Sequence, residues 1–190
     1  QEAEVPVTRS ESSPAINLPT APDEVARLRL DKLSEASRTL IERLALLGRL
    51  LPADLVAALW DGDEEVFLDA IDELVRTRLL AEDVAHDRVR YRFEAEGFRE
   101  AVIRSIASER KTALHAFIAN QLERGFVRRR NELAHVLARH HRAGGQSARA
   151  VRYLEVLARQ AASRGDLEGG LRRLTEARST LMERPRNRAS

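Results

Sequence analysis

The chain of 190 residues contains no cysteine, few aromatic residues and no long apolar stretch. Without cysteine it has no disulfide framework, no thiolate nucleophile and no cysteine-based zinc site. No stretch approaches the ~20 apolar residues that a membrane-spanning helix needs. We therefore expect a soluble, cytoplasmic protein that does not bind membranes.

Aromatic residues make up only 4% of the chain, whereas hydrophobic residues make up 43%. The core must therefore consist of Leu, Ala, Val and Ile, a mixture that favours helices. A chain of this length buries about 70% of its unfolded surface, which is enough for one ordinary domain or two small ones. The composition thus predicts a mainly α fold with a sizeable core.

The net charge of +2 hides an uneven distribution along the chain. Residues 1–95 hold 12 Lys/Arg against 20 Asp/Glu, whereas residues 96–190 hold 20 against 10, so the two parts carry −8 and +10. This pattern predicts that the two parts contact different partners or that they contact each other. Lys32 and Lys111 are the only lysines. We attribute the preference for Arg to compositional bias of the source genome rather than to phosphate binding.

The first 19 residues combine Pro, Ser and Glu with few large apolar side chains and no helical period. They cannot recover the entropy of ordering by burial, which predicts a disordered linker over residues 1–19. The chain begins at Gln1 rather than Met and has no signal-peptide pattern, so we expect it to be a fragment of a longer protein.

Residues 20–95 predict three to four helices followed by a two-stranded hairpin. The first helix begins at Thr20, the second is capped by Ser34 and ends at Gly48 in the left-handed conformation, a third begins at Pro52, and a fourth is capped by Asp63. The apolar side chains predicted to be buried are Val25, Leu28 and Leu30 in the first helix, and Val66, Phe67, Ile71, Leu74 and Val75 in the fourth.

The hairpin is predicted at residues 79–82 and 89–93, where apolar side chains alternate with arginine in the second segment. Three helices, a further helix and then a hairpin is the order of a winged-helix module.

The remainder is predicted to be helical, with a connecting helical pair over residues 96–130 and TPR-like helices over residues 131–190. The expected helices cover residues 97–106, 109–124, 131–143, 147–164 and 167–183. A weak repeat of about twenty residues places Gly145, Ala150 and Leu154 in register with Gly165, Gly170 and Leu174. Small residues at matching positions let helices approach and stack, as at the start of an α-solenoid.

Two stretches of the sequence resemble a known family. They are LRLDKLSEASRTLIERLALLGRLLPADLVAALWDGDEEVFLDAIDELVRTRLLAED from residue 28 and YRFEAEGFREAVIRSIASERKTALHAFIANQLE from residue 91. They are similar to the region that follows the nucleotide-binding core in bacterial signal-transduction ATPases with numerous domains, which include multidomain transcriptional regulators and ATPase-linked kinases or cyclases. The resemblance covers residues 28–178 and is spread over many weak positions.

The resemblance implies a winged helix that packs on an ATPase core and holds its nucleotide state, and a solenoid that senses an input partner or self-associates. This chain has no G-x-x-x-x-G-K-[ST] loop, so we expect no cofactor here and place ATP in a core outside it. The sequence departs from the family at Glu94 and Ala95, where the family has Arg-His, and at Gly97, where it has an apolar residue.

A winged helix suggests DNA binding, but the helix before the hairpin carries the wrong charge. Asp63, Glu64, Glu65, Asp69, Asp72 and Glu73 crowd residues 63–77, whereas a DNA-binding surface needs several cationic contacts. Weaker nucleic-acid candidates are the hairpin arginines Arg88, Arg90 and Arg92. The acidic helix thus favours protein docking over nucleic acid.

The candidate interface combines this acidic face with a basic run. It consists of Arg124, Arg128, Arg129, Arg130, Asp69, Asp72 and Glu73. The simpler alternative for the basic run is a solvated turn that places Arg near a helix C-terminus. A partner protein, the ATPase core or the acidic half of this chain would satisfy its charge.

The five histidines are His86, His115, His135, His140 and His141. The spacings of the last three do not match the three or four residues that a metal pair on one helix needs, so we expect no metal site. His86 is expected in an exposed turn and His115 as a partly buried helix residue. No serine lies in a nucleophile elbow, and we expect no enzyme activity.

We therefore expect a non-catalytic regulatory fragment that docks on the ATPase core or a partner protein. The alternatives are a DNA-binding winged-helix domain of a transcriptional regulator, or a scaffold that self-associates as a homo-oligomer.

Overall fold

The computed structural model describes residues 22–85 and 88–182, which form a mainly helical molecule with one small sheet. In chain order the elements are α1 (Pro22–Asp31), α2 (Glu35–Leu47), β1 (Leu50–Pro52), α3 (Ala53–Ala58), α4 (Glu64–Arg76), β2 (Leu80–Ala85), β3 (Arg88–Phe93), α5 (Glu96–Ser105), α6 (Ser108–Gly125), a 3-10 helix (Val127–Arg129), α7 (Ala134–Ala143), α8 (Ser147–Ser163) and α9 (Leu167–Met182). The predicted linker, the helix start at Thr20 and the turn at His86 lie outside the described residues.

The sheet has three antiparallel strands in the order β1-β3-β2, so the predicted two-stranded hairpin is incomplete. The additional strand pairs Leu51 with Tyr91, and β2 pairs Val84 with Val89. Three residues are too few to display strand alternation. Pro52 is both the last residue of β1 and the residue before α3, and from the sequence it indicates only the start of a helix.

The two predicted side-chain caps are confirmed. Ser34 accepts a hydrogen bond from the backbone N–H of Ser37, and Asp63 accepts one from that of Glu65 at 2.8 Å. The predicted left-handed Gly48 is wrong, because its φ of 155° and ψ of −165° describe an extended conformation that side chains rarely adopt. The chain leaves α2 directly into β1 instead of turning back.

Two arginines from distant helices bind the C-terminal end of α2. Arg99 of α5 donates to the carbonyl of Ala45 at 2.8 Å, and Arg139 of α7 donates to that of Leu47. The last carbonyls of a helix have no partner within it and carry partial negative charge, which a guanidinium satisfies. Cations from the basic half therefore cap a helix of the acidic half.

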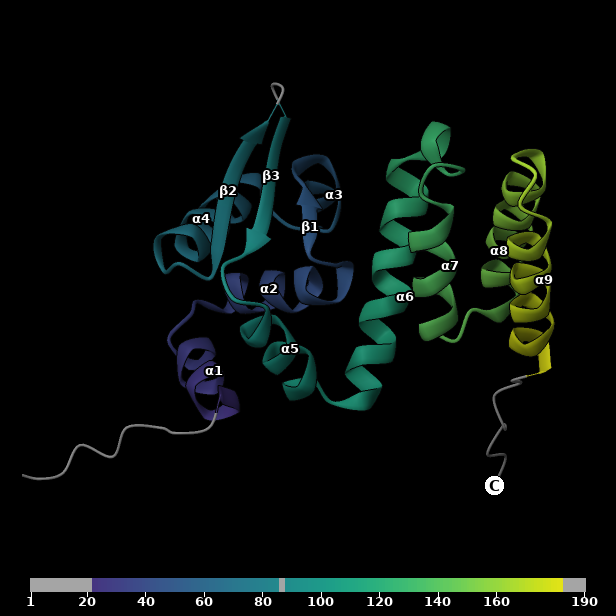
Figure 1. The fold of residues 1–190 in the computed structure, drawn as a ribbon. Helices are drawn as coiled ribbons and strands as arrows, with labels where there is room; N and C mark the ends of the chain where they lie inside the picture. Colours follow the sequence, from purple (N-terminus) through teal and green to yellow (C-terminus); the bar gives the residue numbers. More distant parts are fainter. Residues whose placement is uncertain (1–21, 86–87, 183–190) are drawn as a thin grey trace, which may run out of the picture.

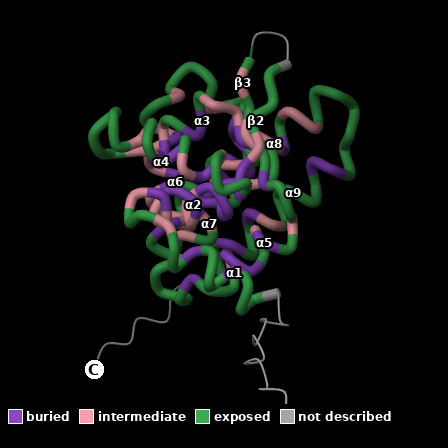
Figure 2. Tube along the Cα trace, turned by 90° about the vertical axis from the view of Figure 1, so that its left-hand side faces the viewer, coloured by how far each residue is buried: buried purple, intermediate pink, exposed green. Residues whose placement is uncertain are grey.

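The core forms around α2, whose side chains at Leu40, Ile41 and Leu44 have no exposed surface. Helices α4, α5 and α6 pack against it, and the buried segments gather around these crossings (Figure 2). Ile118 of α6 and Leu137 of α7 continue the same core into the second half.

The predicted apolar stripe of α1 is wrong in two of its three residues. Val25 and Leu28 are 39% and 46% exposed, whereas Ala26 and Leu30 are buried where α1 packs on α5. Ala26 and Leu30 are four residues apart and share one helix face, but alanine contributes little to an apolar pattern. In α4, Ile71 and Leu74 are buried as predicted, and Val66 is 44% exposed.

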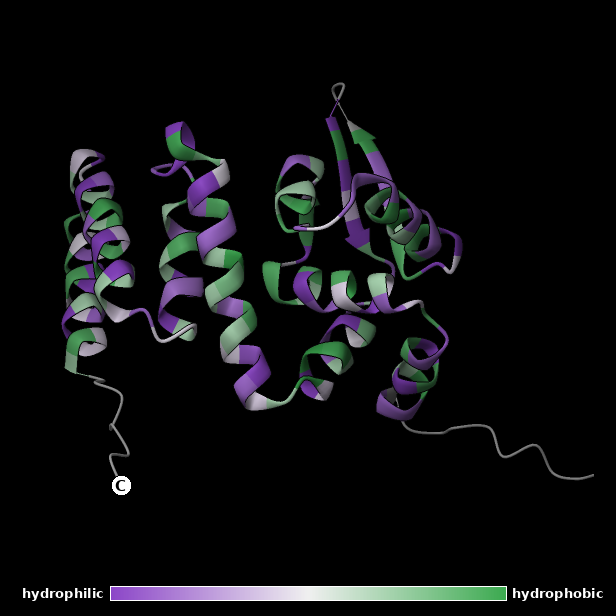
Figure 3. Ribbon diagram, turned by 180° about the vertical axis from the view of Figure 1, so that it is seen from behind, coloured by the Kyte–Doolittle hydropathy of each residue, from purple (hydrophilic) through white to green (hydrophobic). Residues whose placement is uncertain are grey.

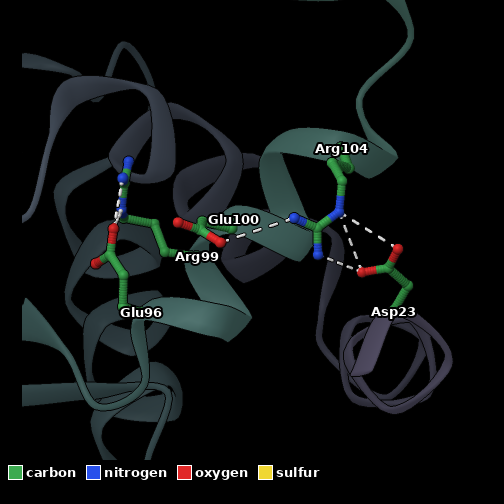
Figure 4. Close-up of polar contacts among 5 residues, drawn as sticks. All are labelled: Asp23, Glu96, Arg99, Glu100 and Arg104. Carbon is green, nitrogen blue, oxygen red and sulfur yellow. Dashed lines mark hydrogen bonds and ion pairs between the residues drawn. The ribbon is translucent and has the colours of Figure 1, made fainter. Parts of the chain in front are cut away.

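One ion pair joins α1 to α5, as Figure 4 shows. Arg104 of α5 pairs with Asp23 of α1 and also approaches Glu100 within 3.8 Å. On the same helix, Arg99 pairs with Glu96 at 2.6 Å, and this contact orients the guanidinium that caps α2.

Helices α6 to α9 stack side by side in chain order, away from the sheet (Figure 1). The predicted helix at residues 131–143 begins only at Ala134, after the 3-10 turn. Within the described part of the chain, none of the helices has the length and apolar character required to cross a bilayer.

Gly144, the residue that follows α7, lies close to the backbone of α6. A Cβ added there would lie 2.6 Å from the backbone nitrogen of Ala116, which cannot move without shifting α6. We predict that Gly144→Ala lowers the free energy of unfolding by about 1–3 kcal/mol in urea denaturation. Gly97 lies in α5 with open space around it, so Gly97→Ala is the matched control and should be neutral or stabilising. Equal effects of the two substitutions would contradict this packing.

Candidate functional site

The basic run predicted as an interface divides into two pairs of arginines. Arg129 pairs with Asp54 at 2.7 Å and with Glu132 at 2.9 Å, and Arg130 donates to the carbonyl of Glu123. Arg124 and Arg128 are exposed and form no ion pair with any described residue. Arg129 and Arg130 thus make contacts within the fold, whereas Arg124 and Arg128 are available to a partner.

The acidic face of α4 is also partly used by the fold. Glu73 accepts hydrogen bonds from the hydroxyls of Ser34 at 2.6 Å and Ser37 at 2.5 Å, and these bonds lower the pKa of its carboxyl. Asp69 and Asp72 stay exposed and line a shallow hollow with Arg76 and Val66. Figure 1 shows α4 on one side of the sheet and the basic run beyond α3 on the other, so they do not form one surface.

The structure does bring together two groups of arginines that the sequence keeps apart. Arg88 and Arg90 of β3 and Arg129 of the 3-10 helix line one cavity of about 800 Å³. Arg92, the third hairpin arginine, does not line it and lies 3.9 Å from Glu94. Sequence reasoning missed this site because its residues come from segments about forty positions apart.

A second hollow, of about 620 Å³, lies between α8 and α9 and is mainly apolar. It is lined by Glu155, Ala158, Arg159, Ala162, Leu167, Gly170, Leu171 and Leu174, which we call the α8–α9 groove. Leu167, Leu171 and Leu174 are 70%, 65% and 49% exposed. In the view from behind, hydrophobic and hydrophilic segments alternate along this pair of helices (Figure 3). A row of leucines is thus presented to solvent beside a groove.

Helices α8 and α9 each contact the two helices before them. Helix α8 packs on α7 and reaches α6, where Tyr153 donates to Glu123 at 2.7 Å. Helix α9 packs on α8 and reaches α7, where Glu176 pairs with Arg142 at 3.3 Å. A further helix following the same rule would contact α9 and α8, which is where the α8–α9 groove lies.

Two histidines from different helices meet in the interior. Nδ1 of His115 in α6 lies 2.9 Å from Nδ1 of His140 in α7, and Arg139 donates to Nε2 of His140. Because a guanidinium can only donate, we assign the proton of neutral His140 to Nδ1, which donates it to His115. Spacing along one helix could not reveal this pair, since its members are 25 residues apart on two helices.

Burial keeps this histidine pair neutral. His140 has no exposed surface, and its burial, followed by the charge of Arg139, lowers its pKa to about 2. Burial also lowers the pKa of His115, with Arg139 and Lys111 acting in the same direction. Both ring nitrogens of His140 are engaged, so it has no free site for a proton or a metal. In the described residues no three His, Asp or Glu side chains are placed to hold a metal ion.

A second polar network joins α6, α7 and α8. The buried ring of His141 stacks on Tyr153 with 5.6 Å between centroids, and its Nδ1 contacts Oε1 of Gln146. Burial, together with the hydrogen bond to Glu123, raises the pKa of Tyr153 to about 12. The network adds polar contacts to the buried leucines and isoleucine that these three helices share, among them Ile118, Leu137 and Leu154.

No protein-family model matches this chain, and the comparison with curated proteins finds no similar sequence. The cavity, the groove and the charged surfaces are therefore the features from which a function can be inferred.

The neutral histidine pair predicts an acid-sensitive fold. Above pH 6.5, both the folded and the unfolded chain keep His140 neutral, and its contribution to stability is complete. As the pH falls below 6.5, only the unfolded chain takes up the proton, so stability decreases by up to about 1.4 kcal/mol per pH unit for this residue. Urea denaturation between pH 7.5 and 5 measures the slope.

His140→Gln should reduce this slope, because the residue that titrates is removed. His135 is exposed, so His135→Gln is the matched control and should retain the parent slope. An unchanged slope in the His140 variant would place the acid sensitivity elsewhere.

Glu73 and Asp72 are neighbours on α4 with different roles, which predicts different effects on stability. Glu73→Gln removes a charged acceptor of two hydroxyls and should lower the free energy of unfolding by about 1–2 kcal/mol. Asp72→Asn, the control, should change it by less than about 0.5 kcal/mol because the side chain is exposed. Thermal melting of both variants tests this assignment, which equal losses would contradict.

Proposed function

We propose that this chain is a non-catalytic regulatory module that binds other proteins, built as a winged-helix module followed by TPR-like helices. The order of the elements supports the first part, since α2, β1, α3, α4, β2 and β3 follow one another as in winged helices, with β3 central in the sheet. The stacking of α6 to α9 supports the second part. The resemblance to signal-transduction ATPases sets the module beside an ATP-binding core outside this chain.

The acidic surface of α4 argues against the DNA-binding alternative. In a winged helix this helix would enter the major groove. Here Glu64, Glu65, Asp69 and Asp72 are exposed along it, and none forms an ion pair with a described residue. These carboxylates would face the phosphates with like charge. Val66 and Leu68 are exposed between them, a mixture better suited to a protein surface.

The α8–α9 groove is the observation that carries the proposal. It lies where another helix would pack if that helix contacted the two before it, as α8 and α9 do. Its leucines lack a partner among the described residues. The occupant is an amphipathic α-helix of a partner protein, with leucines toward Leu171 and Leu174. Glu155 and Arg159 on α8 are both exposed at the groove, so a basic and an acidic side chain on that helix complement them.

We predict that a synthetic amphipathic peptide of about 18 residues, with leucines every three or four positions, binds saturably in fluorescence anisotropy. Leu171→Glu with Leu174→Glu places two charges in the groove and should weaken binding at least about tenfold. Thr175→Glu with Ser179→Glu adds the same charge to exposed positions of α9 outside the groove and should leave binding unchanged.

Equal binding of a scrambled peptide, or equal loss in the two double variants, would overturn the docking proposal. Submicromolar affinity for duplex DNA that falls steeply with salt would support the DNA-binding alternative instead. A mass above that of one chain in light scattering, reduced by the Leu171/Leu174 variant, would support self-association.

A further inference from the structure

The cavity beside β1 and β3 has the features of a binding site for a small anion. Its volume of about 800 Å³ lies within the range of small-molecule pockets, about 300–1,000 Å³. It opens between the first and second halves of the chain, where Arg129 crosses from the 3-10 helix to Asp54 of α3. Elements of both halves therefore shape it.

The charges in the cavity are distributed unevenly. Its two carboxylates, Asp54 and Glu132, are both held by Arg129 at 2.7 and 2.9 Å. Arg88 and Arg90 also line it, are exposed, and form no ion pair with a described residue. Both carboxylates are thus paired with one guanidinium, the three arginines outnumber the two carboxylates by one, and Arg88 and Arg90 are left for a ligand.

These two guanidinium groups are placed to act together. Arg88 and Arg90 occupy alternate positions of β3 and so project from the same face of the sheet, about 7 Å apart along the strand. Asp83 lies opposite Arg90 on β2, at a distance too great for an ion pair. Two planar forks of donors side by side match a group with many acceptor oxygens, which favours phosphate over a single carboxylate.

The rest of the lining is apolar and suits the organic part of a ligand. Leu50, which is 70% exposed, lies with Pro52 and Val89 along the same cavity. Pro52 pairs with Arg90 across the sheet, so an apolar surface directly adjoins a free cation. We propose that this cavity binds a small phosphate-bearing molecule through Arg88 and Arg90, independently of helix docking at the α8–α9 groove.

Isothermal titration calorimetry with pyrophosphate, at ionic strength held constant with chloride, tests the proposal. The full chain should bind saturably with a dissociation constant below about 1 mM. Arg88→Gln and Arg90→Gln should each weaken binding about tenfold, since each removes charge-assisted hydrogen bonds. Arg92→Gln is the matched control from the same face of the strand, because Arg92 lies outside the cavity, and should change affinity less than about twofold.

A second variant tests the role of the salt bridges. Asp54→Asn removes a carboxylate from the lining and one partner of Arg129, so pyrophosphate should bind more tightly, by about twofold or more. Absence of saturation in the parent, an Arg92 variant as weak as the other two, or weaker binding by Asp54→Asn would each overturn the proposal. Duplex DNA that binds more tightly than pyrophosphate and depends on all three arginines would overturn it in favour of a nucleic-acid surface.

Discussion

The structure depends on the end of one helix. Helix α2 lies at the centre of the core, and two of its last carbonyls, those of Ala45 and Leu47, accept hydrogen bonds from the second half of the chain. Arg99 and Arg139, from two helices that follow much later in the sequence, donate to them. Buried carbonyls without donors are costly, so these two arginines stabilise the end of α2. They join the second half of the chain to the first.

Contacts between the two halves account for part of the uneven charge of the sequence. The basic half uses several of its arginines on the acidic half, at Asp23, Glu42 and Asp54. Arg43 is an arginine of the acidic half that contacts the basic half, since its guanidinium lies 4.1 Å from the ring centre of Phe117 on α6. Of the two partner arrangements that the charge pattern allowed, contact between the halves is present. The exposed acidic residues of α4 and the arginines at the cavity are among the charged groups that other molecules can reach.

Local signals predicted well wherever the responsible residues lie close together in the sequence. Ser34 and Asp63 cap their helices because the donors they serve are two or three residues away. The alternation of β3 and the periodicity of the last four helices likewise belong to single elements. The stripe of α1 could not be predicted, because its buried face depends on α5, some seventy residues later, and uses a small alanine.

Features that combine residues from several segments could not be predicted from the sequence. The strand β1 exists only through its pairing with β3, and the histidine pair requires α6 and α7 to be packed. The arginine cavity combines residues that the sequence indicated separately, one group as a wing and the other as a turn. In each case the residue types were informative, but which residues contact one another depends on the tertiary fold.

Within the described part of the chain, α9 packs on α8 and reaches α7 through the ion pair of Glu176 with Arg142. Its inner face is made of small residues, Gly169, Gly170, Ala177 and Thr180, so close approach replaces large apolar side chains there. Helix α9 is the last helix in the described stack, and its separation would expose the face of small residues that packs on α8. A helix bound in the adjoining groove would complete its surroundings, so occupancy there would register as slower amide exchange along α9.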